Sequence, residues 1–524
     1  MVAANAANAA DTSGDVRIAR IARWPLPAEA LLVALLAAFL YLGLGAELPI
    51  DDTVRFTPNI AAGVYEWDAA HLLMQPSVVL WHRYFGGTAL ESQERYNAVC
   101  AGLSLGILDL LLAALGVETG RRLALLALGA LSCNLLVLAT SGHIKLGALP
   151  FLTLALHQSV LWEKEGGDRR LAIAAAALGI AAAYLISSIL VAPFLVLAVL
   201  VKRRDVWRAI GVGALCGAVA FGILGIGYVL VTLGPWSPRG FFTFLLAKGA
   251  ERPSSDGVVQ SLLRGGFGVV QNFVYVGDFG AMLRSALGGG AASVARHLGI
   301  FAAEGMVFLL AAGLLGWVWL RGRLLTPWAF ILGTLAFAIP WNLNEADFYF
   351  PLTFPTVALL AVSPPSRLRR PLTLLLLGLV AGTTLLGEAL PRKLYPLKRY
   401  EAELQRRLTP RDVAVHWIEW SGGPSLSFMK LPGVTRTHLD RLYARSSDPR
   451  QVLPAAERVW DRSLADGGRV YLFGILDDRD WNAPWPLLRR KGVTREALER
   501  QLQERYTVVS LGEVAGIPCW ELRP

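Results

Sequence analysis

The apolar segments constrain this chain most, because several of them reach the length of a membrane-spanning helix. A helix needs roughly 20 mainly apolar residues to cross the hydrocarbon core of a bilayer. Of the 524 residues, 54% are hydrophobic and only 17% are charged, so a water-soluble enzyme is excluded. We therefore expect a mainly α protein built as a polytopic transmembrane helical bundle.

About eleven spans are expected when each apolar segment is placed across the membrane. They cover residues 26–44, 98–116, 123–140, 146–162, 171–201, 209–233, 300–320, 324–340, 350–362 and 372–390. The segment 171–201 is counted as two spans. Basic loops flank it at both ends, which predicts a shallow hairpin of two short helices with a break around Ser187 and Ser188.

Basic residues set the expected orientation. Arg17, Arg20 and Arg23 precede the first apolar segment, and cytoplasmic ends of spans collect Lys and Arg. We therefore expect a cytoplasmic N-terminal tail over residues 1–25, outer loops at 45–97 and 234–299, and an outer C-terminus, in an inner (cytoplasmic) membrane. The formal charge of +10 has the same topological origin, so no nucleic-acid partner is expected.

Two further regions complete the expected layout. Apolar patches at 241–246 and 267–275 alternate with basic residues, which favours amphipathic helices in the membrane interface. From residue 391 to 524 the composition becomes polar and charged, with strand-like runs at 413–417, 470–473, 507–511 and 518–522 and helical patterns at 394–408 and 494–504. This predicts a small α/β domain outside the membrane, either a structural cap or an acceptor-binding surface.

Acidic side chains gather in the first outer loop. Asp51 and Asp52 lie a few residues past the first apolar segment, where a carboxylate could accept the proton of an acceptor hydroxyl. Either could instead cap a following helix, because Asp is a favoured N-cap residue. Asp68 and His71 follow, and if residues 61–73 are helical they share a face with Gln75 and could hold a divalent metal ion or orient a pyrophosphate-like group. An ordinary surface helix is the alternative.

Other outer positions carry candidate binding groups. His143 and Lys145 sit in the short turn SGHIK, where Lys145 could contact a lipid phosphate or reach the membrane interface without a ligand. A second acidic turn holds Glu345 and Asp347 beside aromatic residues; it could bind sugar hydroxyls or be simply solvated. Three arginines are further phosphate candidates, because the guanidinium group matches phosphate oxygens: Arg55, Arg239 and Arg264.

The layout resembles the GT-C superfamily of integral-membrane glycosyltransferases, which use polyprenyl-phosphate sugars. The resemblance rests on IDD after the first segment, EWDAAHLLMQP, SGHIK followed by ALP, ILVAPFLVLAVLVKRR, NEADFYFPLTFP and the outer C-terminal domain. It implies a polyprenyl-phosphate sugar donor, a glycan, lipid or protein acceptor, and a first-loop acid, Asp51 or Asp52, as base or metal ligand.

Two other functional classes fit the same residues. A carrier or flippase could move a lipid-linked sugar unchanged, with the acids as binding groups. A non-catalytic assembly subunit could dock a partner through its outer domain.

Overall fold

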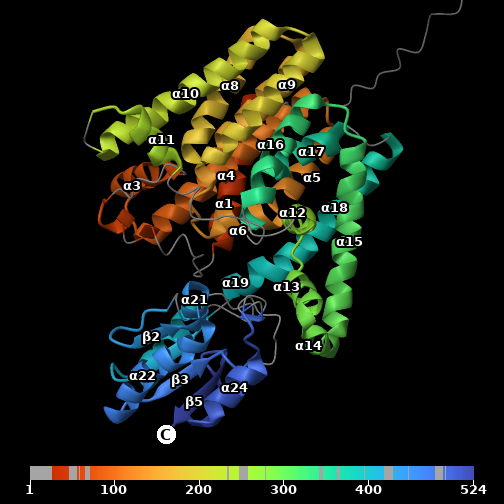
Figure 1. Cartoon of the computed structure of the whole chain (residues 1–524). Helices are drawn as coiled ribbons and strands as arrows, with labels where there is room; N and C mark the ends of the chain where they lie inside the picture. The colour runs from red at the N-terminus through yellow and green to blue at the C-terminus, as the bar shows by residue number, and fades with distance from the viewer. Residues whose placement is uncertain are drawn as a thin grey trace, which may run out of the picture.

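A computed structural model of the chain describes most of the sequence. The described residues are 26–45, 56–57, 59–64, 71–232, 235–246, 258–277, 279–341, 346–362, 366–394, 396–417, 426, 429–446, 448–477, 485, 488–489 and 491–524. Helices dominate them, and a small sheet lies at the C-terminal end of the chain (Figure 1).

Six described helices are long and apolar enough to cross a membrane. They are α1 (Leu26–Leu44), α4 (Ala89–Ala114), the joined η3 (Ile186–Leu190) and α9 (Val191–Arg203), α10 (Val206–Thr232), α15 (Leu298–Leu320), and the run of α18 (Ser366–Thr384), η7 (Leu385–Ala389) and α19 (Leu390–Leu394). The last helix thus continues past the predicted end at residue 390. Eleven spans and their orientation remain a prediction.

The predicted third span is bent. Two helices, α5 (Thr119–Ala130) and α6 (Cys133–Thr140), meet at an angle of 64°. The backbone N–H groups of Cys133 and Asn134, at the start of α6, donate to the carbonyls of Phe273 and Asn272. The bend is therefore held by hydrogen bonds from a distant segment, as a broken helix within a membrane bundle requires.

The predicted break in 171–201 is confirmed. Helix α8 (Asp168–Tyr184) ends at Tyr184, the short η3 follows, and α9 then continues to Arg203. The preceding α7 (Leu149–Glu165) packs beside α8 and α4. The break falls within three residues of the predicted position at Ser187 and leaves the last carbonyls of α8 for partners outside the helix.

Small residues bring α1 and α4 close together. A Cβ at Gly102 would lie 2.4 Å from the carbonyl oxygen of Ala34, and one at Gly106 would lie 2.6 Å from that of Ala30. Glycines four apart on one helix face allow this backbone approach, a common device where membrane helices pack. α1 therefore sits tightly against the helix that carries much of the candidate site.

The segment after α10 is helical but differs from the expectation. It contains α11 (Pro238–Leu246), α12 (Val258–Gln271), α13 (Phe279–Ser285), η5 (Ala286–Gly290) and α14 (Ala291–Arg296). Val270, Phe273 and Val274 of the patch 267–275 are buried in the bundle core and do not form an exposed apolar face, while the interfacial depth of the segment remains a prediction. Near the end of the bundle come α16 (Leu325–Trp341), η6 (Ala346–Leu352) and α17 (Thr353–Val362).

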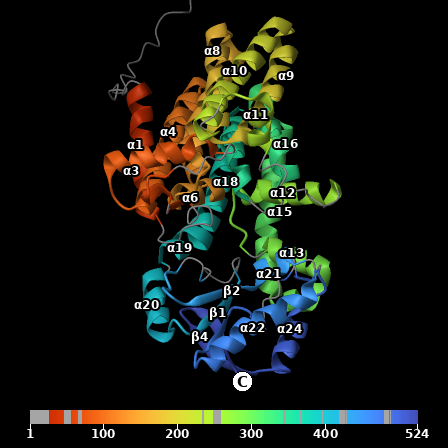
Figure 2. The same cartoon turned by 60° about the vertical axis from the view of Figure 1, so that its left-hand side comes forward.

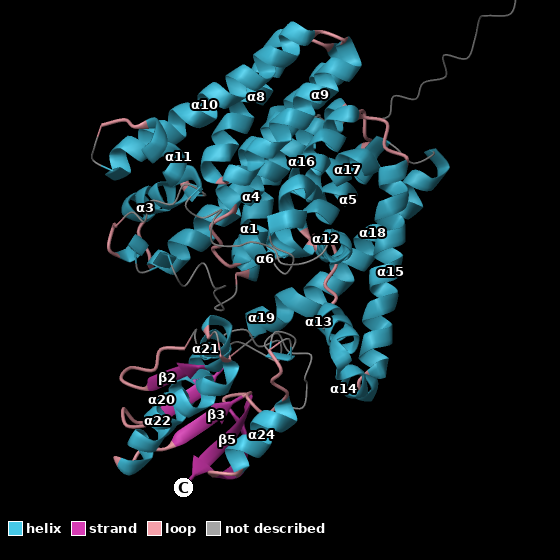
Figure 3. Ribbon diagram, in the orientation of Figure 1, coloured by secondary structure: helices cyan, strands magenta, loops and turns pink. Residues whose placement is uncertain are grey.

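The C-terminal α/β domain has its own sheet and core (Figure 3). The strands are β1 (Val413–His416), β2 (Thr435–His438), β3 (Val470–Phe473), β4 (Thr507–Val514) and β5 (Ile517–Arg523), in the order β2-β1-β3-β5-β4. β1 pairs in parallel with β2 and β3, whereas β5 is antiparallel to both neighbours. The helices are α20 (Leu397–Arg407), α21 (Leu439–Arg445), α22 (Val452–Ala465) and α24 (Arg495–Gln503).

This domain faces one end of the bundle. Figures 1 and 2 both place it beyond the end at which α6 and α3 (Met74–Phe85) lie. A hydrogen bond of 2.7 Å from Arg489 to the hydroxyl of Ser285 on α13 joins the two parts. We call this end of the bundle the mouth; among the described residues it comprises 56–57, 59–64 and 71–73 of the loop expected outside the membrane (called the first outer loop below), α3, the start of α4, the turn 141–145 and η6.

Candidate functional site

The described residues within the range 61–73, which are 61–64 and 71–73, do not continue as the helix expected there. Residues 59–61 are helical, but Gly63 adopts a positive φ of 65° and the helical stretch ends before it. Glycine takes this left-handed conformation readily, and it stops a helix. Among the described residues, Gln75 belongs to the separate helix α3 and His71 lies before its start, while Asp68 lies outside the described residues.

Hydrogen bonds between described residues hold this loop to the bundle, and three of them are as follows. The side-chain Nε2 of Gln93, on α4, donates to the hydroxyl of Thr57 over 2.7 Å. The backbone N–H of Leu73 donates to the carbonyl of Ala183 over 3.1 Å, and Nδ1 of His71 lies 3.4 Å from the carbonyl of Tyr184. The free carbonyls at the broken end of α8 thus provide two of the three anchors.

The contact with Tyr184 sets the state of His71. A carbonyl oxygen can only accept, so Nδ1 of His71 carries the proton in this contact. In the neutral ring the lone pair then lies on Nε2, the arrangement that commonly prepares a histidine as a metal ligand or hydrogen-bond acceptor.

Tyr184, at the end of α8, joins α3, α4 and α7. Its hydroxyl lies 2.8 Å from that of Ser77 on α3 and 3.4 Å from that of Tyr96 on α4. Its ring stacks on Phe151, with centroids 5.5 Å apart. Gly147 permits this position, because a Cβ there would lie 2.5 Å from the Tyr184 ring. The end of α8 is therefore fixed by both its backbone and its side chain.

The turn 141–145 is buried beside α4. Asn97 is fully buried on α4, and its Nδ2 donates to the carbonyls of Leu138, over 3.1 Å, and His143, over 2.6 Å. His143 is only 4% exposed. One amide thus ties the end of α6 and the turn to α4.

Lys145 connects this turn to η6. Its side chain is 2% exposed, and its Nζ lies 3.4 Å from the centroid of the Phe348 ring. A cation over an aromatic face is stabilised by the ring quadrupole, more strongly where water is excluded. Phe348 also contacts Phe337 of α16, with centroids 5.4 Å apart. Lys145 is therefore a buried, positioned cation rather than a side chain reaching the interface.

A small cavity lies where these segments meet. Its lining comes from the first outer loop, α3, α4 and the turn 141–145, and consists of Phe56, Ile60, His71, Met74, Gln75, Val78, Gln93 and Ile144. The lining combines apolar side chains with hydrogen-bonding groups. The cavity volume is about 10 Å³, which is room for one water molecule or one hydroxyl group.

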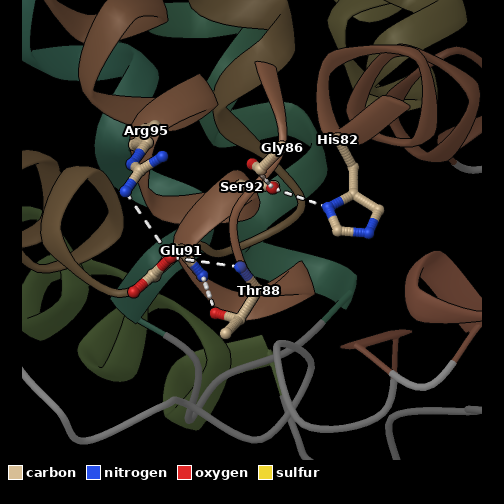
Figure 4. A network of polar contacts seen from close by, with 6 residues as sticks. All are labelled: His82, Gly86, Thr88, Glu91, Ser92 and Arg95. Atoms are coloured by element: carbon tan, nitrogen blue, oxygen red, sulfur yellow. Dashed lines mark hydrogen bonds and ion pairs between the residues drawn. The ribbon is translucent and has the colours of Figure 1, made fainter. Parts of the chain in front are cut away.

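The corner between α3 and α4 is fixed by a second polar network (Figure 4). Thr88 caps α4: its hydroxyl accepts from the backbone N–H of Glu91 over 3.2 Å, while the Glu91 carboxylate accepts from the N–H of Thr88 over 3.1 Å. Nδ1 of His82 lies 2.9 Å from the hydroxyl of Ser92, which lies 3.2 Å from the carbonyl of Gly86. This capping box sets where α4 begins.

Most of the remaining predicted site residues lie outside the described part of the chain. Asp51, Asp52, Arg55, Asp68 and Glu345 lie outside the described residues, as do the side chains of Asp347 and Arg264.

Arg239 is exposed on α11. Phe241 of that helix packs with Leu72 of the first outer loop and with Tyr228 of α10. Arg239 is therefore carried by a helix that contacts the mouth.

A metal site is not complete within the described residues. No group of three or more His, Cys, Asp or Glu side chains suited to a metal ion occurs among them. Of the two predicted ligands, His71 is described and lines the cavity, whereas Asp68 is not.

Sequence reasoning missed Gln93, Asn97 and Tyr184. Gln93 and Asn97 are four residues apart at the start of an apolar helix, and a pair of amides at that spacing shares one helix face. That spacing could have indicated a buried polar stripe. Tyr184 carried no signal of its own, since its role depends on where α8 ends.

Two solved structures are similar to this chain. One is the protein O-mannosyltransferase Pmt1-Pmt2 complex of S. cerevisiae bound to the sugar donor, with 14% identity, 43% of this chain and 34% of that chain covered, and a TM-score of 0.32. The other is the oligosaccharyltransferase AglB of Archaeoglobus fulgidus in complex with an inhibitory peptide and a dolichol-phosphate, with 14% identity, 93% and 73% covered, and a TM-score of 0.49.

The chain spans about a third of the length of the O-mannosyltransferase chain. No family model and no curated protein sequence matches it. With both TM-scores below 0.5, the site rests on the contacts described above. By their names, the two similar proteins are transferases of sugars, the class that the layout of the sequence resembles.

Proposed function

We propose that this chain is a membrane glycosyltransferase that moves a sugar from a polyprenyl-phosphate donor to an acceptor hydroxyl at the outer face of the membrane. The observation that carries the proposal is the meeting of three separate segments at the mouth. The first outer loop bonds to α4 through Thr57 and Gln93, the turn 141–145 bonds to α4 through Asn97, and Lys145 reaches Phe348 of η6.

In the proposed reaction, Asp51 or Asp52 is the general base. The covalent chain keeps both within about 18 Å of Phe56 in the cavity wall, since four or five residues extend roughly 3.5 Å each. The carboxylate takes the proton of the acceptor hydroxyl, and the acceptor oxygen bonds to the anomeric carbon. The bond from that carbon to the phosphate oxygen breaks, and the polyprenyl phosphate leaves with its electron pair.

This single displacement inverts the anomeric centre and needs no covalent enzyme intermediate. The leaving phosphate is stabilised by positive charge, for which the buried Lys145 and the exposed Arg239 are the described candidates. Arg55, Arg264 and His143 are further candidates for the phosphate, and Glu345 and Asp347 for sugar hydroxyls. A divalent ion held by Asp68 and His71 is a further proposal.

The test uses the purified full-length chain in liposomes with a polyprenyl-phosphate hexose labelled in the sugar. We expect Asp51→Asn combined with Asp52→Asn to lower transfer at least about 100-fold, because general bases contribute roughly 100- to 10,000-fold. Asp168→Asn is the matched control. Asp168 is 71% exposed in a surface ion pair with Arg208 at the cytoplasmic loop expected between spans, so transfer should be unchanged.

Full transfer by the folded double variant would remove the acids from the mechanism. The other functional classes give different results. A carrier exchanges lipid-linked sugar across sealed vesicles without forming a glycosidic bond. An assembly subunit loses complex formation when residues 391–524 are removed, while the acid variants have no effect.

A further inference from the structure

The further inference concerns Gln93 in the cavity wall. Its side chain is fully buried, its Nε2 donates to Thr57, and its Oε1 has no hydrogen-bond partner among the described residues. A buried amide oxygen without a donor is unfavourable, because it gives up its hydrogen bonds to water and gains none in the protein. With the amide turned over, the Thr57 hydroxyl would donate to Oε1 and Nε2 would be the unpaired atom. In both settings one amide atom has no partner among the described residues.

The chemistry of the cavity indicates which partner fits. Among the described residues that line the cavity there is no Lys, Arg, Asp or Glu, while His71 and Gln75 add hydrogen-bonding groups. These described groups favour a hydroxyl over a phosphate, which requires cations or clustered N–H donors. A hydroxyl group suits the cavity, because it can donate to Oε1 or accept from Nε2.

We propose that this cavity binds a hydroxyl-bearing edge of the donor sugar, with Gln93 as the group that selects it. The phosphate of the same donor would lie at Lys145, whose turn contributes Ile144 to the cavity wall. Sugar and phosphate would thus be bound by adjacent parts of one turn, one neutral and one cationic. This inference rests on the proposed polyprenyl-phosphate donor and adds the place and chemistry of sugar recognition.

The experiment compares two ligands on the full-length protein in detergent: a polyprenyl-phosphate hexose and the sugar-free polyprenyl phosphate. The measured quantity is the ratio of their affinities, which isolates the contribution of the sugar. We expect the wild type to bind the sugar-bearing ligand more tightly, and Gln93→Met to lower the ratio by about 3- to 10-fold, the worth of one hydrogen bond.

Two matched variants separate sugar binding from loop anchoring. Thr57→Val removes the anchor of the loop but leaves Oε1 of Gln93, so it should weaken the binding of both ligands alike and lower the ratio less than Gln93→Met does. Gln93→Glu keeps hydroxyl-accepting oxygens at both amide positions, so it should retain most of the ratio even if Gln93→Met does not fold.

An unchanged ratio in a folded Gln93→Met variant would overturn the proposal and leave a buried water as the partner of Oε1. A wild-type ratio of one would overturn it as well. The affinity ratio does not depend on the proposed catalysis. Asp51→Asn and Asp52→Asn should keep the wild-type affinity ratio even where they abolish sugar transfer. The binding test therefore reports on sugar recognition by Gln93, and the transfer test reports on the acids.

Discussion

The mouth of the bundle and the C-terminal domain satisfy their buried polar groups in opposite ways. In the domain, β1 and β3 are buried along their whole length, and the sheet ladder pairs their backbone groups in regular register. In the mouth, the broken ends of α6 and α8 leave backbone carbonyls that accept hydrogen bonds from single side chains or from loop amides. A ladder spreads its hydrogen bonds over many residues, whereas the mouth depends on a few.

The difference has a consequence for function. Breaks in helices place carbonyls and polar side chains where a membrane bundle can bind a ligand, provided that other groups satisfy them. The mouth is therefore more sensitive to substitution than the sheet, because one substitution can leave several buried polar groups without a hydrogen-bond partner. The domain has its own core, and changes there should act on its folding without altering the mouth.

The largest effect is expected at Asn97. Asn97→Leu would leave the carbonyls of Leu138 and His143 without their donor. Each unsatisfied buried group costs about 1–3 kcal/mol, so the loss should reach about 2–6 kcal/mol. We expect a clear fall in the thermal midpoint of the purified protein and loss of sugar transfer, measured in the assay described for the acid variants.

Ser104→Ala is the control on the same helix face of α4. Ser104 is also fully buried, but its hydroxyl donates only to the carbonyl of Cys100 within the helix. Its removal should change the thermal midpoint little. Equal effects of Asn97→Leu and Ser104→Ala would contradict the view that the mouth depends on contacts between segments.

An effect of intermediate size is expected in the domain at low pH. His416 and His438 face each other on paired strands, with ring centroids 4.4 Å apart. Burial, and then the neighbouring His438, lower the pKa of His416 to about 3. The folded domain therefore holds His416 neutral, whereas the unfolded chain takes up a proton below about pH 6.5.

The stability contributed by neutral His416 is thus complete above pH 6.5 and is lost as the pH falls towards 3. At about 1.4 kcal/mol per pH unit, the loss at pH 5 is about 2 kcal/mol. Hydrogen exchange of peptides from β1 and β3, corrected for intrinsic rates, should accelerate from pH 7.5 to pH 5. His416→Asn, which keeps a donor for the Trp417 carbonyl but does not titrate, should flatten this dependence. The same acceleration in His416→Asn would exclude His416 as its source.

Much of the fold could be predicted because it follows from local patterns. The apolar run of α1 was predicted with its bounds, Leu26–Leu44, and four strands of the domain were found near their positions. β2 was missed because TRTH is short and polar, and its place depends on pairing with β1. The bend between α5 and α6 was missed because its hydrogen-bond partners lie more than 130 residues away.

The candidate site could be predicted only in part. Basic loops on both sides of 171–201 indicated the break, and SGHIK and the late acidic turn were linked by resemblance; the structure brings Lys145 to Phe348, next to Asp347 in sequence. The roles of Gln93 and Tyr184 could not be predicted, because they depend on which loop faces each side chain in three dimensions. Asp51 and Asp52 as the base remain a prediction.

The smallest effects are expected at two helix caps, one in each region. Thr88 caps α4 at the mouth, and Thr494 caps α24 in the domain, where its hydroxyl accepts from the N–H of Ala497 over 3.2 Å. Changing either to Ala removes the same kind of hydrogen bond, at about 1 kcal/mol. Because the chemical change is matched, any difference in outcome reflects the surroundings of the cap.

We expect Thr88→Ala to lower the rate of sugar transfer severalfold, since α4 carries Gln93 and Asn97 one and two turns past its cap. Thr494→Ala should leave transfer unchanged and accelerate hydrogen exchange only in α24 and the adjacent β4. The test measures the rate of sugar transfer and the backbone hydrogen exchange of both variants in parallel. If Thr494→Ala slows transfer as much as Thr88→Ala, the domain is coupled to the mouth, and a contact such as Arg489 to Ser285 becomes the route by which it acts.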